Sequence, residues 1–352
     1  MQKMKALVVH SANDLRLDEI DVPTPGANEV LVRMAYAGIC GSDVSYVKNG
    51  ASGTAVLKNP LVLGHEVSGI IAALGDGVET LEVGQAVTIY PATVVGDEVL
   101  PERLAGRDNL YSQVRYFGSA ALDPHTDGGM SEYKLVAADH IIPLPAELDL
   151  KRAALAEPLA VGIHAINRVN SVLPEGIAGK PIAINGAGPI GLLLLAAAKQ
   201  RGASRIVAID VNEAALERAK ALGADEIVNA AKDEIPAGIE IVFETSGVAA
   251  TFGAVLSALE KGGLLVQVGN LPSTAVNAVL GQLVTREITW IGSYRFIDEM
   301  NDAVSLLAAG LNVDAVISHE FELAQGIEAF DVALDREQDS AKILIRLLEE
   351  GN

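Results

Sequence analysis

Residues 186–191 read Gly-Ala-Gly-Pro-Ile-Gly, and this turn follows one apolar run and opens another. The first glycine of such a motif permits a tight turn, the second lets the backbone approach a pyrophosphate, and the third lets a helix pack against a sheet. Amide groups at the start of that helix then face the phosphates. The stretch therefore predicts a strand, a phosphate-binding turn and a helix, with the contacts made by Gly186, Gly188, Pro189, Ile190 and Gly191.

Asp210 ends the next predicted strand, nineteen positions after Gly191. An acid at this place can hydrogen-bond the ribose hydroxyls of an adenine dinucleotide. It would also repel a 2′-phosphate, and Val211 and Asn212 bring no positive charge, so NAD is favoured over NADP. In the alternative interpretation the glycines serve only strand–helix packing and Asp210 caps the following helix.

Strands and helices alternate around this turn between about residues 159 and 293. That alternation is typical of a doubly wound parallel sheet, the Rossmann fold. From about residue 5 to 145, short β-rich runs separated by turns predict a compact β-barrel-like domain instead. The two helices and one strand expected after residue 293 are too short to stand alone, so we expect them to fold back onto the first domain.

The composition suits a packed protein of two domains. The chain has 352 residues, of which 50 % are hydrophobic and 20 % charged, and its formal net charge is −20. Such a charge repels phosphate backbones and anionic lipid, so we expect neither nucleic acid nor membrane as a partner. The N-terminus lacks a signal-peptide pattern and one cysteine fits a reducing compartment, which favours a cytoplasmic location.

Cys40 is the only cysteine of the chain, and His65 follows it after 25 positions, with Glu66 next. A thiolate, an imidazole and a carboxylate can fill three positions of a zinc shell and leave the fourth open for substrate. Each residue also has an ordinary structural interpretation. Cys40 can be a small buried hydrophobe, His65 a core histidine and Glu66 an ion-pair partner.

These motifs together resemble the medium-chain, zinc-dependent alcohol and polyol dehydrogenases. The resemblance rests on GICGSD at residues 38–43, GHEVSG at 64–69 with Gly75, and AEPLAVGIH at 156–164, the last being typical of the sorbitol and idonate branch. RYFGSA at 115–120, DGG at 127–129 and GSYRF at 292–296 look most like the L-idonate 5-dehydrogenases. The resemblance implies an α/β protein in which residues 1–158 plus 294–352 form a GroES-like β-barrel catalytic domain and residues 159–293 form the NAD-binding Rossmann domain.

The resemblance also implies roles for individual residues. Cys40, His65 and Glu157 would surround a catalytic zinc, with Glu66 a direct ligand or one water away. Ser42 would be the first proton acceptor, although a serine at this place can also be a helix N-cap. Further contacts implied for the cofactor are Val268, Gly269 and Ser293, and those implied for the substrate are Tyr46, Phe117 and Arg295. We expect His164 to pack rather than to bind metal.

The expected enzyme transfers a hydride between NAD and a secondary hydroxyl of a sugar acid or polyol, with L-idonate oxidised to 5-keto-D-gluconate as the leading choice. Arg295 favours an acid because a guanidinium can pair with a carboxylate through two hydrogen bonds. A neutral-polyol dehydrogenase and a non-catalytic NAD-binding protein are the alternatives. The resemblance favours a homotetramer, with a homodimer next.

Two departures from the family are informative. Relatives often carry four cysteines that bind a second, structural zinc, but residues 92–111 here contain none. The acids Asp97, Glu98, Glu102 and Asp108 offer no thiolate, so we predict one catalytic zinc and no structural zinc. Ser45 stands where polyol-dehydrogenase relatives often have a histidine, which leaves the route of the proton open.

Overall fold

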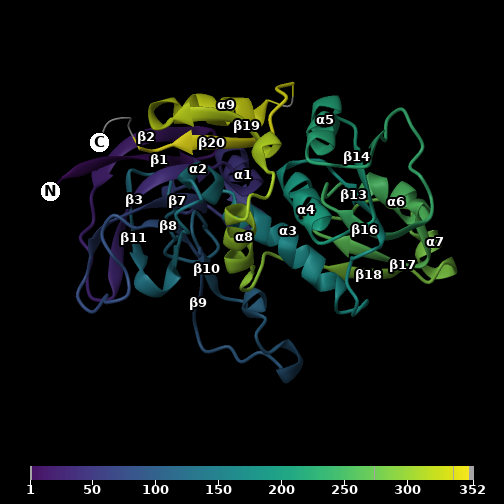
Figure 1. Cartoon of the computed structure of the whole chain (residues 1–352). Helices are drawn as coiled ribbons and strands as arrows, with labels where there is room; N and C mark the ends of the chain where they lie inside the picture. The colour runs from purple at the N-terminus through teal and green to yellow at the C-terminus, as the bar shows by residue number, and fades with distance from the viewer. Residues whose placement is uncertain (1, 273, 336, 349–352) are drawn as a thin grey trace. The chain divides into compact units, whose positions relative to one another are not determined.

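The computed structural model describes residues 2–272, 274–335 and 337–348, and it divides into two compact units (Figure 1). The first unit contains Met1–Glu157, Val304–Ala309 and Ile317–Asn352. The second contains Pro158–Ala303 and Gly310–Val316.

A parallel sheet of six strands forms the centre of the second unit. Its strands are β13 (Pro181–Asn185), β14 (Arg205–Asp210), β15 (Glu226–Asn229), β16 (Ile239–Glu244), β17 (Leu259–Gln267) and β18 (Thr289–Gly292). They lie in the order β15-β14-β13-β16-β17-β18, so the direction of winding reverses between β13 and β16. The predicted doubly wound sheet is confirmed, and ligands of such sheets bind beyond the strand carboxyl ends at this reversal.

Helices follow these strands where the sequence alternation predicts them. They are α3 (Ala156–Val169), which begins at the boundary of the two units, α4 (Pro189–Gln200), α5 (Glu213–Ala221), α6 (Phe252–Ala258), α7 (Gly281–Thr285), the start of α8 (Glu299–Ala308), and the short 3₁₀ turns η4 (Ala249–Thr251) and η5 (Asp314–Val316). Residues 191–198 of α4 are all buried, which explains their unbroken apolar sequence. Pro189 begins α4, where its fixed φ suits the first turn and no amide is needed.

The main sheet of the first unit has seven strands, with β11 paired to β3. Its members in spatial order are β12 (Ile141–Pro143), β8 (Ala86–Ile89), β7 (Glu66–Leu74), β3 (Glu29–Gly38), β20 (Lys342–Arg346) and β19 (Ile317–Glu322), with β11 (Tyr133–Ala137) beside β3. The smaller sheets are built from β1 (Lys3–Ser11), β2 (Asp14–Asp21) and β6 (Leu61–Val62), from β4 (Ala51–Ser52) and β5 (Ala55–Val56), and from β9 (Ala92–Val94) and β10 (Val114–Tyr116). Because β20 pairs antiparallel with β3, the last strand of the chain lies beside the strand that leads to Cys40.

Short helices connect the strands of the first unit. They are α1 (Gly41–Asn49), α2 (Leu150–Ala153), α9 (Gly326–Leu334) and the 3₁₀ turns η1 (Glu102–Leu104), η2 (Asp108–Leu110), η3 (Ala138–His140) and η6 (Leu323–Gln325). Cys40 is the extended N-cap of α1, and Asp43 accepts a hydrogen bond from its amide at 3.0 Å. Gly50 ends the helix with φ 65°, a conformation that favours glycine.

The chain between β9 and β10 extends away from the strands of its own unit (Figure 1). Glu98 closes this lobe because its carboxylate accepts hydrogen bonds from the amide and hydroxyl of Ser112, both at 2.6 Å. Across the described residues, no helix has the length and apolar character needed to cross a membrane.

Candidate active site

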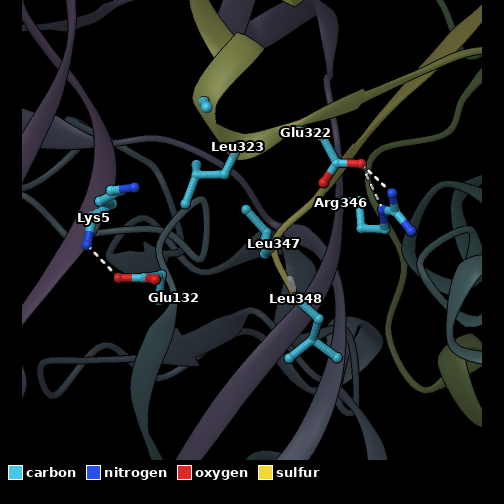
Figure 2. A pocket seen from close by; sticks show the side chains of 8 residues that line it. Lys5, Glu132, Glu322, Leu323, Arg346, Leu347 and Leu348 are labelled. Atoms are coloured by element: carbon cyan, nitrogen blue, oxygen red, sulfur yellow. Dashed lines mark hydrogen bonds and ion pairs between the residues drawn. The ribbon is translucent and has the colours of Figure 1, made fainter. Parts of the chain in front are cut away.

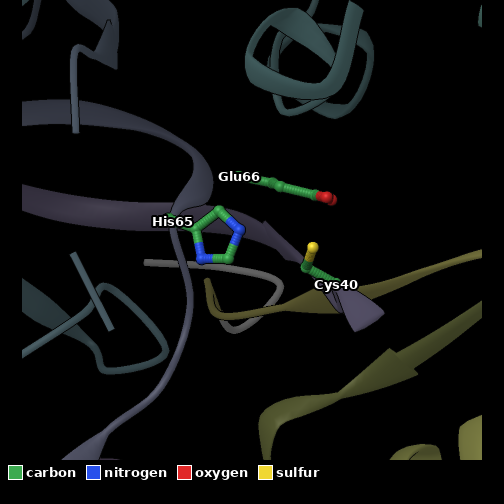
Figure 3. A group of neighbouring side chains, drawn as sticks. All are labelled: Cys40, His65 and Glu66. Atoms are coloured by element: carbon green, nitrogen blue, oxygen red, sulfur yellow. The ribbon is translucent and has the colours of Figure 1, made fainter. Parts of the chain in front are cut away.

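Three of the four expected metal ligands converge in the first unit. A ligand atom from each of Cys40, His65 and Glu66 lies within 4.8 Å of the other two, and Figure 3 shows the three side chains directed toward one another. The pairing of β3 with β7 sets Gly38 opposite Glu66. A Cβ on Gly38 would lie 2.1 Å from Glu66 Oε2, so only glycine leaves room for this carboxylate.

The donor set fits a zinc ion. His65 is 6 % exposed, and its buried Nδ1 has no hydrogen-bond partner. That nitrogen lies 4.0 Å from Asp43 Oδ1, so the fit to zinc rests on the three donor types and their spacing rather than on Nδ1. A thiolate, an imidazole and a carboxylate are ligands that zinc accepts in a catalytic site with one open position. No second group of three potential ligands occurs in the part of the chain that the structure describes.

Asp43, which we did not predict as a site residue, joins the two ligand loops. It is fully buried, and its carboxylate accepts hydrogen bonds from the amides of Cys40 at 3.0 Å and Gly64 at 3.2 Å. Its Oδ1 also lies 4.0 Å from His65 Nδ1. Burial lowers the pKa of His65, but the nearby charges of Cys40 and Asp43 outweigh burial and hold that pKa well above 6.5. The sequence signal that could have indicated Asp43 is its place in the first turn of α1, three residues after Cys40.

Lys342 is a second residue that sequence reasoning missed. Its ammonium lies 2.5 Å from the Glu66 carboxylate and donates to the carbonyl oxygen of Ile39 at 2.9 Å. Both charged side chains are at most 2 % exposed. Burial lowers the pKa of Lys342, but the charges of Glu66 and Cys40 and the hydrogen bond to Glu66 together outweigh burial, so the net shift of this pKa is upward. No local motif predicts this pair, because 276 positions separate the two residues.

Glu157 lies outside the group formed by the three converging ligands. It is 5 % exposed and accepts a hydrogen bond from the hydroxyl of Tyr116 at 2.5 Å. The Tyr116 ring in turn packs edge-on against His65, with 5.5 Å between ring centroids. Burial raises the pKa of Glu157, and the charge of Glu66 adds to the effect. The structure therefore holds Glu157 beside the cluster through Tyr116.

The other site residues expected in the first unit differ in how far they are exposed and in the contacts they make. Ser42 is partly exposed in the first turn of α1, and because Cys40 is the N-cap, the N-cap interpretation of Ser42 is wrong. The Ser45 hydroxyl donates to the carbonyl oxygen of Gly41 within the same helix. Tyr46 is 2 % exposed, and its hydroxyl accepts a hydrogen bond from the amide of Ala120. Phe117 is buried, with the Lys134 ammonium 4.8 Å from its ring centroid.

The glycine turn of the second unit joins β13 to α4 with little room for side chains. Gly186 has φ 106°, and a Cβ on Gly191 would lie 1.9 Å from the Gly186 carbonyl oxygen. A Cβ on Gly188 would meet nothing within 4 Å, so packing within the protein does not require that glycine. Gly188 is exposed at the start of α4, with Pro189 and Ile190 partly exposed after it. Open backbone at a helix N-terminus fits a phosphate group.

Asp210 is tied to this turn. Its Oδ2 accepts a hydrogen bond from the amide of Ala187 at 2.6 Å, and its Oδ1 accepts from the amides of Val211 and Asn212. Asn212 is the residue that caps α5, through a hydrogen bond from the amide of Ala215 at 3.1 Å. The interpretation of Asp210 as a helix cap is therefore wrong.

The remaining expected cofactor contacts lie at the carboxyl ends of the next strands. The amides of Val268 and Gly269 both donate to the carbonyl oxygen of Glu244, which ends β16. The amide of Ser293 donates to the carbonyl oxygen of Gln267 at 2.8 Å. The Ser293 hydroxyl and the Gln267 side-chain oxygen are buried without a hydrogen-bond partner. Unsatisfied polar atoms at this edge fit a polar ligand such as a dinucleotide.

Glu244 is a third residue that sequence reasoning missed. It is fully buried, and its carboxylate accepts hydrogen bonds from the side chain of Asn185 at 3.1 Å and the amide of Gly247 at 3.1 Å. The Gln267 side-chain amide also donates to it at 2.5 Å. Glu244 thus joins the carboxyl ends of three neighbouring strands, β13, β16 and β17. The sequence signal that could have indicated Glu244 is its place as an acidic residue at the end of an apolar predicted strand.

Arg295 and His164 also lie in the second unit. Arg295 has a left-handed backbone, with φ 51°, and its guanidinium lies 5.0 Å from the ring centroid of Tyr294. His164 Nδ1 lies 2.7 Å from Glu299 Oε1, and His164 is absent from the group of potential metal ligands. His164 therefore packs as expected.

A cavity of about 340 Å³ lies in the first unit at a different place (Figure 2). Its lining includes Lys5, Glu132, Leu347 and the ion pair of Arg346 with Glu322, in which the Arg346 Nε to Glu322 Oε1 distance is 2.8 Å. None of the expected site residues lines it.

Comparison with known proteins identifies the family. Residues 26–146 match the alcohol dehydrogenase GroES-like domain, and residues 189–309 match the zinc-binding dehydrogenase model. The chain is 36 % identical to sorbitol dehydrogenase from Gallus gallus, with 97 % of this chain and 96 % of that protein covered. The chain therefore belongs to the zinc-binding dehydrogenases, and both the GroES-like and the Rossmann parts of the predicted fold are confirmed.

Solved structures agree with this assignment. L-idonate 5-dehydrogenase from Escherichia coli matches with a TM-score of 0.88 at 35 % identity, covering 98 % of each chain. A zinc-binding dehydrogenase from Sinorhizobium meliloti, solved with NADP, matches with a TM-score of 0.85 at 28 % identity, covering 98 % of this chain and 100 % of that one. The chain is thus a zinc-dependent polyol dehydrogenase near the sorbitol and idonate branch, an oxidoreductase that acts on CH–OH donors with a nicotinamide cofactor.

Proposed function

We propose that the chain oxidises a secondary hydroxyl of a sugar acid with NAD and one zinc ion, and that L-idonate, converted to 5-keto-D-gluconate, is its substrate. The convergence of Cys40, His65 and Glu66 carries the proposed chemistry. The likeness to E. coli L-idonate 5-dehydrogenase over nearly the whole chain supports the substrate, together with Arg295 in the GSYRF segment.

Cys40, His65 and Glu66 would hold the zinc, and Glu157, whose carboxylate accepts a hydrogen bond from the Tyr116 hydroxyl, would stand beside them as a further hydrogen-bond acceptor. A zinc ion in such a site lowers the pKa of a bound hydroxyl group. Ser42 would take the released proton toward solvent, since it is partly exposed and directly follows the ligand loop. Because the Ser45 hydroxyl donates to the helix backbone, Ser42 would hand the proton on to a ribose hydroxyl of the dinucleotide or to water.

NAD is the proposed cofactor because Asp210 places a carboxylate at the end of β14, beside the glycine turn. A 2′-phosphate would meet that charge, and no basic residue follows Asp210 directly to offset it. Replacing Asp210 with serine should therefore improve the use of NADP relative to NAD by at least about tenfold. An unchanged ratio of kcat/KM for the two cofactors would contradict this assignment.

Arg295 would pair with the carboxylate of the sugar acid, while Tyr46 and Phe117 would form the apolar side of the substrate site. The Tyr46 hydroxyl already accepts a hydrogen bond from Ala120, so we assign Tyr46 to shape rather than to polar recognition.

The second candidate function is a neutral-polyol dehydrogenase, which the likeness to sorbitol dehydrogenase favours. Initial rates with L-idonate, D-gluconate, sorbitol, xylitol and 2,3-butanediol distinguish the two. We expect the largest kcat/KM with L-idonate. A sorbitol rate far above that of either acid would establish the alternative.

One zinc per chain is the proposed metal content, because residues 92–111 offer carboxylates without a thiolate and Glu98 is already engaged by Ser112. Metal analysis of the purified protein tests this number. Two zinc ions per chain would show that a structural site exists.

We also propose a homotetramer or homodimer. Four large apolar side chains that precede β18 are 38 to 79 % exposed, namely Val276, Val279, Leu280 and Val284. Strand β18 is the last in the order of the parallel sheet. Exposed apolar groups of this kind are typical of interfaces. Light scattering with size-exclusion chromatography should give a mass of two or four chains, and a monomer at micromolar concentration would refute the proposal.

A further inference from the structure

The loop that contains Ser293 and Arg295 is tied to helix α3 at both ends. At its start, Arg168 Nε donates to the carbonyl oxygen of Gly292 at 3.2 Å. At its end, the amide of Ile297 donates to Glu299 Oε2 at 2.7 Å, and Glu299 Oε1 lies 2.7 Å from His164 Nδ1. His164 and Arg168 are four positions apart on α3, so they share one face of that helix.

The tie at the Ile297 end is buried and rich in hydrogen bonds. His164 is 2 % exposed and Glu299 is 4 % exposed. Asn167 adds a third donor, with its Nδ2 at 3.1 Å from Glu299 Oε1. Burial raises the pKa of Glu299, but these three donors outweigh burial and lower it to about 2. Glu299 is therefore ionised at neutral pH, and the network holds it in one orientation.

Between the two ties the backbone takes a conformation that its sequence does not favour. Arg295 has φ 51°, a region that residues with a Cβ rarely occupy unless their surroundings impose it. The next residue, Phe296, is 2 % exposed and anchors the same segment. The two ties to α3 lie on either side of Arg295 and restrict the backbone that carries it.

We propose that His164, Asn167 and Glu299 are positioning residues that hold the 292–297 loop in the conformation presenting Arg295 to the substrate carboxylate. The inference rests on the proposed function of Arg295. It makes preference for a sugar acid over a neutral polyol depend on a buried network whose residues lie outside the group of potential metal ligands.

A double-mutant cycle on the full-length, zinc-loaded enzyme tests this inference. Glu299→Gln removes the charge and one acceptor but keeps the side-chain size. We expect KM for L-idonate to rise about tenfold with kcat within about twofold, because binding that is equal in ground and transition states affects KM alone. KM for sorbitol should stay within about twofold. In an Arg295→Ala background, Glu299→Gln should add nothing, since residues that act through one another are not additive.

Three further variants and a second measurement separate the possible outcomes. His164→Leu should reproduce Glu299→Gln, whereas His164→Asn, which can still donate, should restore most of the wild-type KM. Lys180→Met breaks the ion pair between Lys180, the residue before β13, and Glu240 in β16, and it controls for lost stability. Trypsin cleavage after Arg295, followed by mass spectrometry of the folded protein, should be at least about fivefold faster in Glu299→Gln because the loop is released.

Equal KM changes for both substrates, or a full Glu299→Gln effect without Arg295, would overturn the inference and leave the proposed function intact. If Arg295→Ala alone leaves KM for L-idonate unchanged, the substrate assignment fails and the specificity role of the network fails with it. The trypsin rate then still reports whether the network holds the loop.

Discussion

The candidate metal site of the first unit, which we call the cluster, and the glycine turn of the second unit are built in opposite ways. The cluster joins Cys40 to the His65–Glu66 pair, and Lys342 from a third part of the chain pairs with Glu66. The turn is one contiguous run, 186–191, that presents backbone amides. The cluster buries several charges, whereas the turn depends on the space left by absent side chains.

This difference sets how each region should fail. A buried charge is stabilised by its partner, so removing one member leaves the other uncompensated. A glycine turn is damaged by adding atoms, and the harm depends on what the new atoms meet. Changes in the cluster should therefore affect metal content and stability, while changes in the turn should affect dinucleotide binding.

The largest effect is expected for Cys40→Ala. Without its thiolate the site loses a zinc ligand, so metal content should fall from one zinc per chain toward zero and kcat/KM by at least about a thousandfold. NAD binding, followed by protein fluorescence, should persist. Lys48→Ala, an exposed change near the end of α1, is the control. Retained zinc in Cys40→Ala would remove this thiolate from the metal site.

Lys342→Met should come next. The metal-free protein would keep a buried Glu66 carboxylate without its cation, which lowers the free energy of unfolding by about 3–5 kcal/mol. Bound zinc should offset part of this loss, because it supplies positive charge to Glu66. Urea unfolding with and without a chelator measures the loss of stability in the metal-free and in the zinc-bound protein. Adding Glu66→Gln should recover stability in the metal-free protein, and equal losses with and without zinc would contradict the assignment of Glu66 as a ligand.

Gly188→Ala and Gly191→Ala form a matched pair in the turn. The new methyl group at Gly188 meets no protein atom within 4 Å, so unfolding should be unchanged while Kd for NAD rises about a hundredfold from contact with the pyrophosphate. The methyl group at Gly191 would lie 1.9 Å from the Gly186 carbonyl oxygen and should also cost about 1–3 kcal/mol of stability. Calorimetric titration and urea unfolding distinguish them. Loss of zinc in Gly188→Ala would contradict the expectation that only changes in the cluster affect metal content.

The smallest effect concerns the pH dependence of stability in the second unit. Hydrogen bonds to Glu299 outweigh its burial and lower its pKa from 4.5 to about 2. A depressed folded-state pKa stabilises the protein above pH 4.5, and that contribution is lost as the pH falls from 4.5 toward 2. The stability difference between wild type and Glu299→Gln should thus be full at pH 6 and shrink at pH 4 and pH 3 in urea titrations. A constant difference would show that the charge of Glu299 is not responsible.

Sequence prediction succeeded best where residues that are close in the sequence are also close in space. The glycine turn and the strand that ends in Asp210 are each formed by one short stretch of chain. Their hydrophobic period therefore indicated a strand and a helix, and their residue types indicated a dinucleotide as the ligand. The Cys40 and His65 motifs required the family resemblance, because no periodicity brings them together. Asp43, Glu244 and Lys342 escaped notice because buried acids and lysines look like surface residues until their partners are known.

The sequence by itself determined the class of this protein, since a contiguous turn and paired motifs encode a dinucleotide fold and a zinc-type ligand set. Only the tertiary structure decided which side chains meet. It joined Lys342 to Glu66, held Glu157 on Tyr116 beside the cluster, and tied the Arg295 loop to His164 through Glu299. These pairings depend on strand order and helix packing, which bring together residues that hundreds of positions can separate, and no local pattern records such distances.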